Sequence, residues 1–312
     1  MAFRSGFVSI IGRPNAGKST LLNALVGEKL AIVTRKPQTT RNRIQGMVNV
    51  PKRGKHPAGQ IVLIDTPGVH KPVNSLNRRM MKEVYDALEG CDLLLLIVDT
   101  TEKFGTGDEF VLGIARRTQL PCFLLLNKID TLQKDRLLPV IAKYKDLHDF
   151  AEVVPISALK KSGLDTLLDL LVKALPEGPR YFPADQITDQ PERFLVAELI
   201  REQVLQFTSQ EVPHATTILI DSYEEGAKLT KIAATVYCER EGQKAILIGK
   251  HGANLKKIGT HARQQIERLL GTKVFLELYV KVQPGWRESR GFVEELDWRR
   301  QLEHLSQKRS DE

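Results

Sequence analysis

The segment GRPNAGKS, residues 12–19, limits what this chain can fold into more than any other feature of the sequence. It fits the pattern GxxxxGK[ST], in which glycines let consecutive backbone N–H groups face a phosphate at the N-terminus of a helix. An apolar run at residues 7–11 precedes the segment, and leucines at helical spacing follow it in residues 20–26. The segment therefore predicts a phosphate-binding loop between a strand and a helix.

The residue types of this loop assign it specific roles. Lys18 is predicted to reach the β- and γ-phosphates, and the Ser19 hydroxyl to bind Mg²⁺. The other residues expected to contact the nucleotide from this segment are Gly12, Asn15, Ala16, Gly17 and Thr20. A match to this pattern arises by chance in about 1 in 100 chains of this length, so further motifs must decide.

A second motif, DTPG at residues 65–68, follows the apolar residues 61–64. Asp65 is therefore expected at the carboxyl end of a strand, where open α/β sheets bind ligands, and would hold Mg²⁺ directly or through water. The Gly68 N–H would contact the γ-phosphate, and glycine permits the peptide to rearrange when that phosphate leaves. A plain Pro-Gly turn is the alternative explanation.

The third motif, NKID at residues 127–130, predicts which base is bound. The Asp130 carboxylate can accept from N1–H and the exocyclic amine of guanine, and adenine offers no such donor pair. A buried carboxylate left without these donors is costly, so the wrong base is rejected. Asn127 is expected to support the loop, and Lys128 to lie along the base plane.

The fourth motif, Ser157-Ala158, follows the apolar residues 153–156. It would present the Ala158 backbone N–H to guanine O6, and Leu159 completes the predicted nucleotide-binding set. Ser-Ala alone carries no information. Four motifs in this order, each directly after an apolar run, reduce coincidence to below about 1 in 1000. The sequence therefore predicts a guanine-nucleotide site.

With these motifs in order, the chain resembles the translation-factor-related GTPases of the P-loop class. The resemblance implies a first switch loop at residues 35–41, where a threonine closes over Mg²⁺ when the γ-phosphate is present. Thr40 is the expected Mg²⁺ ligand, and Thr39 is the alternative, unless both only line the loop. Lys18, Thr40 and Gly68 are the expected catalytic residues.

Val69 follows the DTPG motif, at the position where Ras-like GTPases carry the glutamine that orients the attacking water. The chain therefore resembles the GTPases with a hydrophobic residue there. In those proteins an asparagine of the phosphate loop, here Asn15, is associated with a potassium ion. The resemblance implies slow intrinsic hydrolysis that depends on K⁺ over Na⁺.

Apolar runs alternate with helical patterns along the first 175 residues. The runs lie at residues 7–11, 45–50, 61–64, 93–98, 122–126 and 153–156. The helical patterns that separate most of them lie at residues 74–88, 108–117, 134–147 and 163–175. This alternation predicts an α/β fold with a doubly wound, largely parallel sheet.

The composition changes after residue 175. Four prolines within residues 176–191 predict a linker between a GTPase domain, residues 1–175, and a second domain, residues 192–290. The patterns in the second domain follow the order α-β-β-α-α-β, which predicts a smaller α+β domain. A charged C-terminal extension, residues 291–312, is expected to hold a helix around residues 296–305.

The sequence GKHG, from Gly249 to Gly252, lies between the second and third predicted helices of this domain. It resembles the GxxG loop of the K-homology (KH) RNA-binding module in its bacterial form, which binds single-stranded nucleotides. A plain turn between helices is the alternative. The resemblance implies that these RNA contacts come from Gly249, Lys250, His251, Gly252, Asn254, Lys256 and Lys257.

Charge supports this placement of the RNA site. The chain carries a formal net charge of +8, and residues 240–290 hold 11 basic and 4 acidic residues. A local basic excess is the electrostatic signature expected where a protein contacts nucleic acid. Trp286, after the last predicted strand, either stacks on a base or closes a small core.

Two further features bear on location. The three cysteines, Cys91, Cys122 and Cys238, are far apart and lack metal-binding spacing, so they are expected to be reduced core residues of a cytosolic protein. The first motif begins too early to leave room for a signal peptide. The longest apolar run, residues 93–98, is too short to span a bilayer.

The pairing of these two domains, with QTTR, DTPGVHKP and GKHGANLKKIG, resembles the Era family of bacterial GTPases over nearly the full length. The resemblance implies a GTP-hydrolysing switch with Mg²⁺ that binds the 3′ end of small-subunit ribosomal RNA and assists assembly of that subunit. It further implies a cytoplasmic monomer with peripheral contact to the inner face of the membrane. The alternatives are a GTP-dependent RNA-binding scaffold and a GTPase linked to RNA modification.

Overall fold

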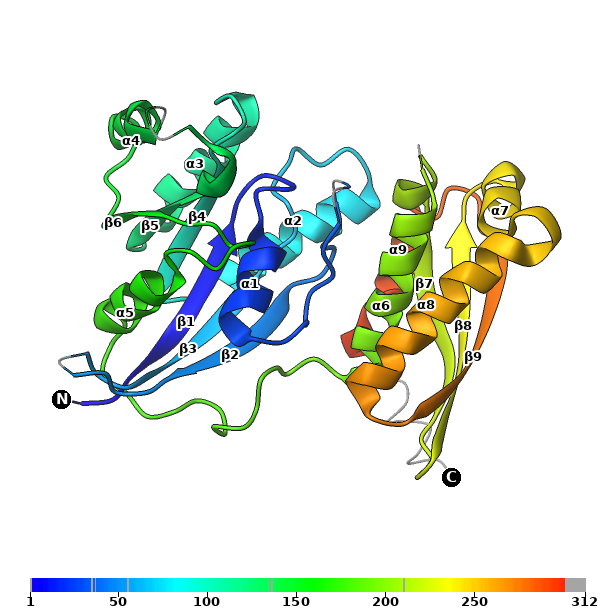
Figure 1. The fold of residues 1–312 in the computed structure, drawn as a ribbon. Helices are drawn as coiled ribbons and strands as arrows, with labels where there is room; N and C mark the ends of the chain where they lie inside the picture. Colours follow the sequence, from blue (N-terminus) through cyan, green and yellow to red (C-terminus); the bar gives the residue numbers. More distant parts are fainter. Residues whose placement is uncertain are drawn as a thin grey trace. The chain divides into compact units, whose positions relative to one another are not determined.

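The computed structural model describes residues 2–300, except residues 35, 37, 55, 134, 136 and 210. Its contacts divide the chain into two compact units (Figure 1). The first unit comprises Met1–Lys71 and Met80–Asp189, and the second comprises Pro72–Arg79 and Gln190–Glu312. Each unit has its own sheet and its own apolar core.

The first unit contains a six-stranded sheet in the order β2-β3-β1-β4-β5-β6. Its strands are β1 (Arg4–Ile11), β2 (Ile44–Val50), β3 (Gly59–Asp65), β4 (Leu93–Asp99), β5 (Cys122–Asn127) and β6 (Glu152–Pro155). All neighbours pair in parallel except β2, which runs antiparallel to β3. The phosphate-binding segment therefore leaves the carboxyl end of a central strand, β1.

Helices cover both faces of this sheet. They are α1 (Lys18–Val26), α2 (Ser75–Leu88), α3 (Thr106–Thr118), α4 (Leu137–Lys145) and α5 (Leu164–Ala174). Helices α1 and α5 contact strands β1, β2 and β3, and an apolar core joins residues of α2, α3 and α4 to strands β4 and β5. The predicted doubly wound α/β sheet is confirmed. The helix expected from residue 134 begins at Leu137, and residues 134 and 136 lie outside the described part.

The second unit follows the predicted order. It contains α6 (Glu192–Phe207), β7 (Thr217–Glu224), β8 (Leu229–Cys238), α7 (Glu241–Ile248), α8 (Ala253–Leu270) and β9 (Lys273–Val282). Strand β8 is central, antiparallel to β7 and parallel to β9. A short 3₁₀ helix, η3 (Val212–Ala215), precedes β7. The predicted α-β-β-α-α-β domain is therefore confirmed.

Two predictions concern the end of the second unit. Helix α9 spans Arg290–Glu295 and was not predicted, whereas residues 298–300 are helical, within the helix expected around residues 296–305, of which residues 301–305 lie outside the described part. Trp286 is fully buried, and its indole N–H donates to the Ala215 carbonyl oxygen at 2.9 Å. Because no face of its ring is open, Trp286 closes a core and does not stack on a base.

The first turns of α2 belong to the second unit. The Leu76 backbone N–H donates to the Arg287 carbonyl oxygen at 3.0 Å, and the Arg79 guanidinium donates to the Val293 carbonyl oxygen at 2.6 Å. These contacts hold Pro72–Arg79, which comes shortly after the DTPG motif in sequence, within the second unit.

The segment after α5 packs along the edge of the first sheet. The Met47 N–H in edge strand β2 donates to the Ile187 carbonyl oxygen at 2.9 Å, and the Thr188 hydroxyl donates to the Gln45 carbonyl oxygen at 2.6 Å. An open edge strand is a template for unwanted pairing. The predicted linker therefore covers the edge of the sheet. Its proline-rich composition does not predict this contact.

Gln60 of β3 holds the same segment from within the sheet. Its side chain is fully buried. Its Oε1 accepts from the backbone N–H groups of Tyr181 and Phe182 at 2.9 and 3.0 Å, and its Nε2 donates to the Phe182 carbonyl oxygen at 2.9 Å. One buried carboxamide thus satisfies three backbone groups of the segment.

The three cysteines are free thiols and all are buried, as expected for core residues. Burial raises the pKa of the Cys122 thiol to about 12, so this residue stays an uncharged thiol. Among the residues that the structure describes, no helix has the length and apolarity needed to cross a membrane.

We expect Gln60→Ala to lower the free energy of unfolding of the first unit by about 1–3 kcal/mol, because it removes three hydrogen bonds to partly buried backbone groups of residues 181 and 182. Urea unfolding of the full chain measures this. Gln133→Ala is the matched control, since Gln133 is exposed in a loop, and it should change stability by less than about 0.5 kcal/mol. Equal effects of the two variants would contradict the role given to Gln60.

Candidate functional site

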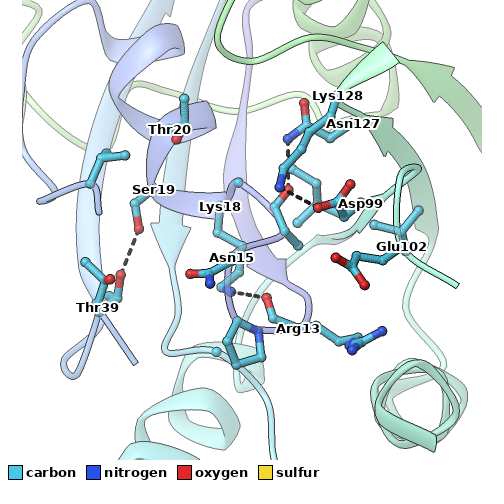
Figure 2. Close-up of a pocket in the computed structure, with 18 of the residues that line it drawn as sticks. Arg13, Asn15, Lys18, Ser19, Thr20, Thr39, Asp99, Glu102, Asn127 and Lys128 are labelled. Carbon is cyan, nitrogen blue, oxygen red and sulfur yellow. Dashed lines mark hydrogen bonds and ion pairs between the residues drawn. The ribbon is translucent and has the colours of Figure 1, made fainter. Parts of the chain in front are cut away.

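A cavity of about 780 Å³ opens in the first unit at the carboxyl ends of the parallel strands (Figure 2). Most of the predicted nucleotide-binding residues line it. They are Asn15, Ala16, Gly17, Lys18, Ser19, Thr20, Thr40, Gly68, Asn127, Lys128, Asp130 and Leu159. Gly12, Asp65 and Ala158 lie outside the lining but hydrogen-bond to Lys18, Ser19 and Asn127, which line the cavity. Ser157 also lies outside the lining and bonds to Lys160 and Ser162.

Two glycines allow the phosphate-binding loop to pack closely. Gly17, immediately before α1, has a φ of 103°, and a Cβ at this position would lie 2.2 Å from Asn127 Nδ2. A Cβ on Gly12 would lie 2.5 Å from the Ile97 carbonyl oxygen. The loop can therefore approach β4 and β5 only with glycine at both positions.

Lys18 lies at the start of α1 and is buried. Its Nζ donates to the carbonyl oxygens of Gly12 and Arg13, at 3.2 and 3.0 Å. Burial lowers the pKa of Lys18 to about 8, and the nearby carboxylate of Asp65 opposes that shift. The ammonium therefore stays mostly charged at pH 7, as a phosphate-binding group must.

Three oxygen-bearing side chains meet beside Lys18. The Ser19 Oγ lies 2.7 Å from Thr40 Oγ1 and 2.7 Å from Asp65 Oδ2. Asp65 is fully buried, and its Oδ1 has no hydrogen-bond partner. Mg²⁺ prefers oxygen ligands and commonly uses one or two protein groups with phosphates and water, so this cluster fits Mg²⁺. Thr39 Oγ1 instead donates to the Lys36 carbonyl oxygen at 2.6 Å.

The Asp65 carboxyl group is electrostatically poised for a cation. Burial raises its pKa to about 6, and the Lys18 ammonium and the hydroxyls of Ser19 and Thr40 counteract that rise. Desolvation disfavours an isolated buried carboxylate, and a bound divalent cation would compensate for it. A bound metal ion would therefore stabilise the charged form of Asp65 in this cluster.

Asn127 joins three loops of the site. Its Nδ2 donates to the Ala16 carbonyl oxygen at 2.8 Å, and its Oδ1 accepts from the Ala158 N–H at 3.0 Å. The support predicted for Asn127 is thus visible in its contacts. The Ala158 N–H, which is the donor predicted for guanine O6, also gives the buried Asn127 oxygen the partner it needs.

Gly68 and Val69 belong to residues 68–73, the segment expected to respond to the γ-phosphate and called here the second switch segment, and the two residues contact different parts of the first unit. A Cβ on Gly68 would lie 2.8 Å from Pro14 Cγ, so this residue rests against the phosphate-binding loop. The Val69 side chain is buried in the apolar core with residues of α2, α3 and β4, and its N–H donates to the Gly12 carbonyl oxygen at 3.1 Å. Val69 therefore cannot orient a water in the cavity.

Sequence reasoning missed part of the cavity wall. The additional lining residues are Arg13, Pro14, Ile32, Val33, Thr34, Gln38, Ile97, Val98, Asp99, Glu102, Asp108 and Thr131. Asp99 ends strand β4, so the strand-end rule that located Asp65 could have located it too. Arg13 forms an ion pair with the buried Asp108 at 2.9 Å, a contact between distant segments that no local pattern indicates.

A second, smaller cavity of about 330 Å³ lies along α8 and β9 in the second unit. It is lined by Gly252, Leu255, Lys256, Gly259, Thr260, Arg263, Leu276 and Leu278. The GKHG loop leads into it through the 3₁₀ helix η4 (Lys250–Gly252), with positive φ at Gly249, His251 and Gly252. This is a groove with apolar walls, two basic side chains, and at one end a loop whose backbone takes positive φ angles.

The predicted RNA-binding residues divide into groups. Gly252 and Lys256 line the groove, and Lys250 and His251 are exposed on the loop. The Asn254 Nδ2 donates to the Ile246 carbonyl oxygen at 2.9 Å and so caps the end of α7.

Lys257 and Gly249 complete the predicted set. The Lys257 Nζ lies 4.3 Å from the centre of the Phe207 ring, so this lysine faces α6 rather than the groove. A Cβ on Gly249 would lie 2.8 Å from the Asn254 Cβ, so Gly249 is required for the loop to turn.

The groove residues that the sequence analysis missed follow periodic patterns that could have predicted them. Leu255, Gly259 and Arg263 follow Gly252 at spacings of three and four residues, which places them on one face of a helix. Leu276 and Leu278 alternate along β9. Combining the GxxG position with these two periodicities would have predicted the groove wall.

The fold and the two sites define a P-loop GTP-binding protein that carries an RNA-binding module of the KH type. A family model described as 50S ribosome-binding GTPase matches residues 7–128, and one described as KH domain matches residues 211–287. The chain belongs to the Era family of GTPases. It is 51% identical over 298 residues to GTPase Era of Geobacter metallireducens, covering 95% of this chain and 98% of that protein.

Two solved structures are similar over nearly the whole chain. One is a variant of Aquifex aeolicus Era bound to GDP and AlF₄⁻, with a TM-score of 0.88, 39% identity, and coverage of 93% of this chain and 98% of that one. The other is Era in complex with MgGDPNP and nucleotides 1506–1542 of 16S ribosomal RNA, with a TM-score of 0.89, 39% identity, and coverage of 94% and 98%.

We expect the affinity for Mg²⁺ to fall by about tenfold per pH unit below pH 6 in the nucleotide complex. The proton competes with the metal at Asp65, and the raised pKa means that the acid form gains population as the pH falls through about 6. Titrating Mg²⁺ against a fluorescent GDP analogue from pH 5 to 8 measures this. The Asp65→Asn variant should bind Mg²⁺ weakly at every pH, and an unchanged slope in that variant would contradict the assignment.

Proposed function

We propose that this chain is a GTP-hydrolysing switch that binds the 3′ end of small-subunit ribosomal RNA and assists assembly of the small ribosomal subunit. The observation that carries the proposal is that one chain holds both the guanine-nucleotide cavity and the KH groove. The relatives add support, since one Era structure contains a GTP analogue together with 16S ribosomal RNA.

In this proposal, catalysis depends on positioning and on charge. The Lys18 ammonium and Mg²⁺ held by Ser19, Thr40 and Asp65 neutralise charge that develops on the phosphates. The Gly68 N–H contacts the γ-phosphate, and its close packing on Pro14 supports that placement. Thr40 rather than Thr39 meets the metal, because Thr40 Oγ1 already lies in the Ser19 and Asp65 cluster.

The base is held at the other end of the cavity. Asp130 accepts from guanine N1–H and the exocyclic amine, and Leu159, which lines the cavity and is largely exposed, covers the base. The backbone of the phosphate-binding loop, from Gly12 to Thr20, holds the phosphates at the N-terminus of α1. Ala158 supports the base through Asn127, and the Ser157 hydroxyl, which accepts from the Lys160 N–H, holds the turn that follows.

RNA is proposed to bind as a single strand in the groove. The phosphates approach the GKHG loop, where glycine backbone and the exposed Lys250 and His251 offer donors. Lys256 and Arg263 provide charge along α8, and the apolar side chains of β9 contact bases. Asn254 and Lys257 act on the shape of the loop and helix rather than on the RNA.

Potassium is the proposed second cation. Asn15 belongs to the phosphate-binding loop and lines the cavity. Its backbone has a left-handed conformation, with a φ of 64°. Since the side chain of Val69 is committed to the core, added positive charge near the β- and γ-phosphates would replace a missing water-orienting group. Hydrolysis is therefore slow without K⁺.

The segment after DTPG supports coupling between the sites. Residues 68–73 would respond to the γ-phosphate, and Pro72–Arg79 belongs to the unit that holds the RNA groove. If GTP raises RNA affinity by some factor, RNA must raise GTP affinity by the same factor.

The wider biological setting is also a proposal. We propose a GTPase domain at residues 1–175 and an RNA-binding domain at residues 192–290, in a monomer located in the cytoplasm. Buried, reduced cysteines support the location. The net charge of +8 would support peripheral contact with an anionic membrane surface.

The proposal is tested by GTP turnover in K⁺ buffer with an oligonucleotide that copies the 3′ end of small-subunit ribosomal RNA. The matching RNA should stimulate turnover, a scrambled RNA should not, and Na⁺ should lower the rate. The double substitution Lys250→Ala and Lys256→Ala should abolish stimulation, with Lys228→Ala as an exposed control outside the groove. A GTP turnover rate that does not change when the matching RNA is added would contradict the coupled switch. Equal turnover rates in K⁺ and Na⁺ buffers would contradict the K⁺ site.

A further inference from the structure

Strand β4 ends at Asp99, which contacts the NKID loop through its sheet partner Asn127 and through Lys128. We propose that Asp99 is a positioning residue for guanine-nucleotide binding, because its carboxylate holds the Lys128 side chain away from Asp130. This inference rests on the base-binding role proposed above for the NKID loop. Three sets of contacts carry it.

The first is the register of the sheet. Asp99 and Asn127 are partners at the carboxyl ends of the parallel strands β4 and β5, so the two loops leave the sheet side by side. The Thr100 N–H and hydroxyl both donate to the Asn127 carbonyl oxygen, at 3.1 and 2.8 Å. The peptide that links Asn127 to Lys128 is therefore fixed by the β4 terminus.

The second is an ion pair between Asp99 Oδ2 and Lys128 Nζ. The Asp99 side chain is 12% exposed and that of Lys128 is 36% exposed, so the pair is shielded on the carboxylate side. Figure 2 shows the two side chains turned toward one another at the wall of the cavity. A pair that is only partly hydrated is held more firmly than one on the open surface.

The third is that Asp99 is itself fixed before it meets Lys128. Its Oδ1 accepts from the Thr101 backbone N–H at 2.9 Å and from the Thr101 hydroxyl at 2.6 Å. Lys128 also has a φ of 68°, a left-handed conformation that costs a non-glycine residue about 1 kcal/mol or more. Asp99 contacts the side chain of Lys128, and Thr100 contacts the carbonyl oxygen that precedes it, so both ends of this residue are restrained.

The consequence concerns charge next to the base. Lys128 and Asp130 are two residues apart and both line the cavity. A Lys128 ammonium without Asp99 would be drawn to the Asp130 carboxylate, which must remain available to the N1–H and the exocyclic amine of guanine. Asp99 thus contributes to guanine selection without touching the nucleotide.

The test uses the full chain and fluorescent GDP, with Asp99→Asn as the nearly isosteric variant. We expect Asp99→Asn to weaken GDP binding about tenfold and to weaken GTP binding equally. Inosine diphosphate lacks the exocyclic amine, so the preference for GDP over this nucleotide should fall by about threefold or more. Glu109→Gln removes an exposed carboxylate of α3 that does not line the cavity, and it should leave both affinities within twofold.

A double-mutant cycle with Lys128→Ala separates positioning from general damage. In the Lys128→Ala background, Asp99→Asn should change GDP affinity by less than twofold. A full tenfold effect in that background, or an unchanged affinity of the single Asp99→Asn variant, would overturn the inference. If Lys128→Ala and Asp130→Asn also leave GDP affinity unchanged, the base-binding role of the NKID loop fails as well.

Discussion

The buried carboxamide of Asn127 is the contact on which the nucleotide site depends. It donates to Ala16 in the phosphate-binding loop and accepts from Ala158 in the last loop of the site, while its own loop carries Asp130. These loops are distant in sequence and meet only because parallel strands end at the same edge of the sheet. Gly17 is glycine because this carboxamide occupies the space of a side chain there.

The metal cluster and the second switch extend from that framework. Asp65 ends β3, Ser19 lies in the first turn of α1, and Thr40 precedes β2, so three segments bring one buried carboxylate and two hydroxyls together. The Val69 side chain packs into the core while its N–H donates to Gly12, which joins the switch to the phosphate-binding loop. The site is therefore largely assembled by the packing of the sheet.

The sequence predicted the fold and the nucleotide site where local chemistry sufficed. Strand ends, glycine positions and motif order located Lys18 and Asp130 in the lining of one cavity and Asp65 in contact with the lining residue Ser19. Long-range partners were out of reach: nothing in the local sequence indicates that Gln60 binds the segment after α5, or that Lys257 packs on Phe207. In the KH groove, the loop was predicted, whereas Asn254 turned out to cap α7, because an amide beside free helix carbonyls is a donor to them.

The most direct measurement is the dissociation rate of fluorescent GDP from the Asn127→Asp variant. A carboxylate keeps the side-chain shape and can still accept from the Ala158 N–H, but it cannot donate to the Ala16 carbonyl oxygen. We predict dissociation at least about tenfold faster, since losing a buried hydrogen bond costs about 1–3 kcal/mol. Dissociation within twofold of the unaltered chain, at an unchanged melting temperature, would contradict the central place given to Asn127.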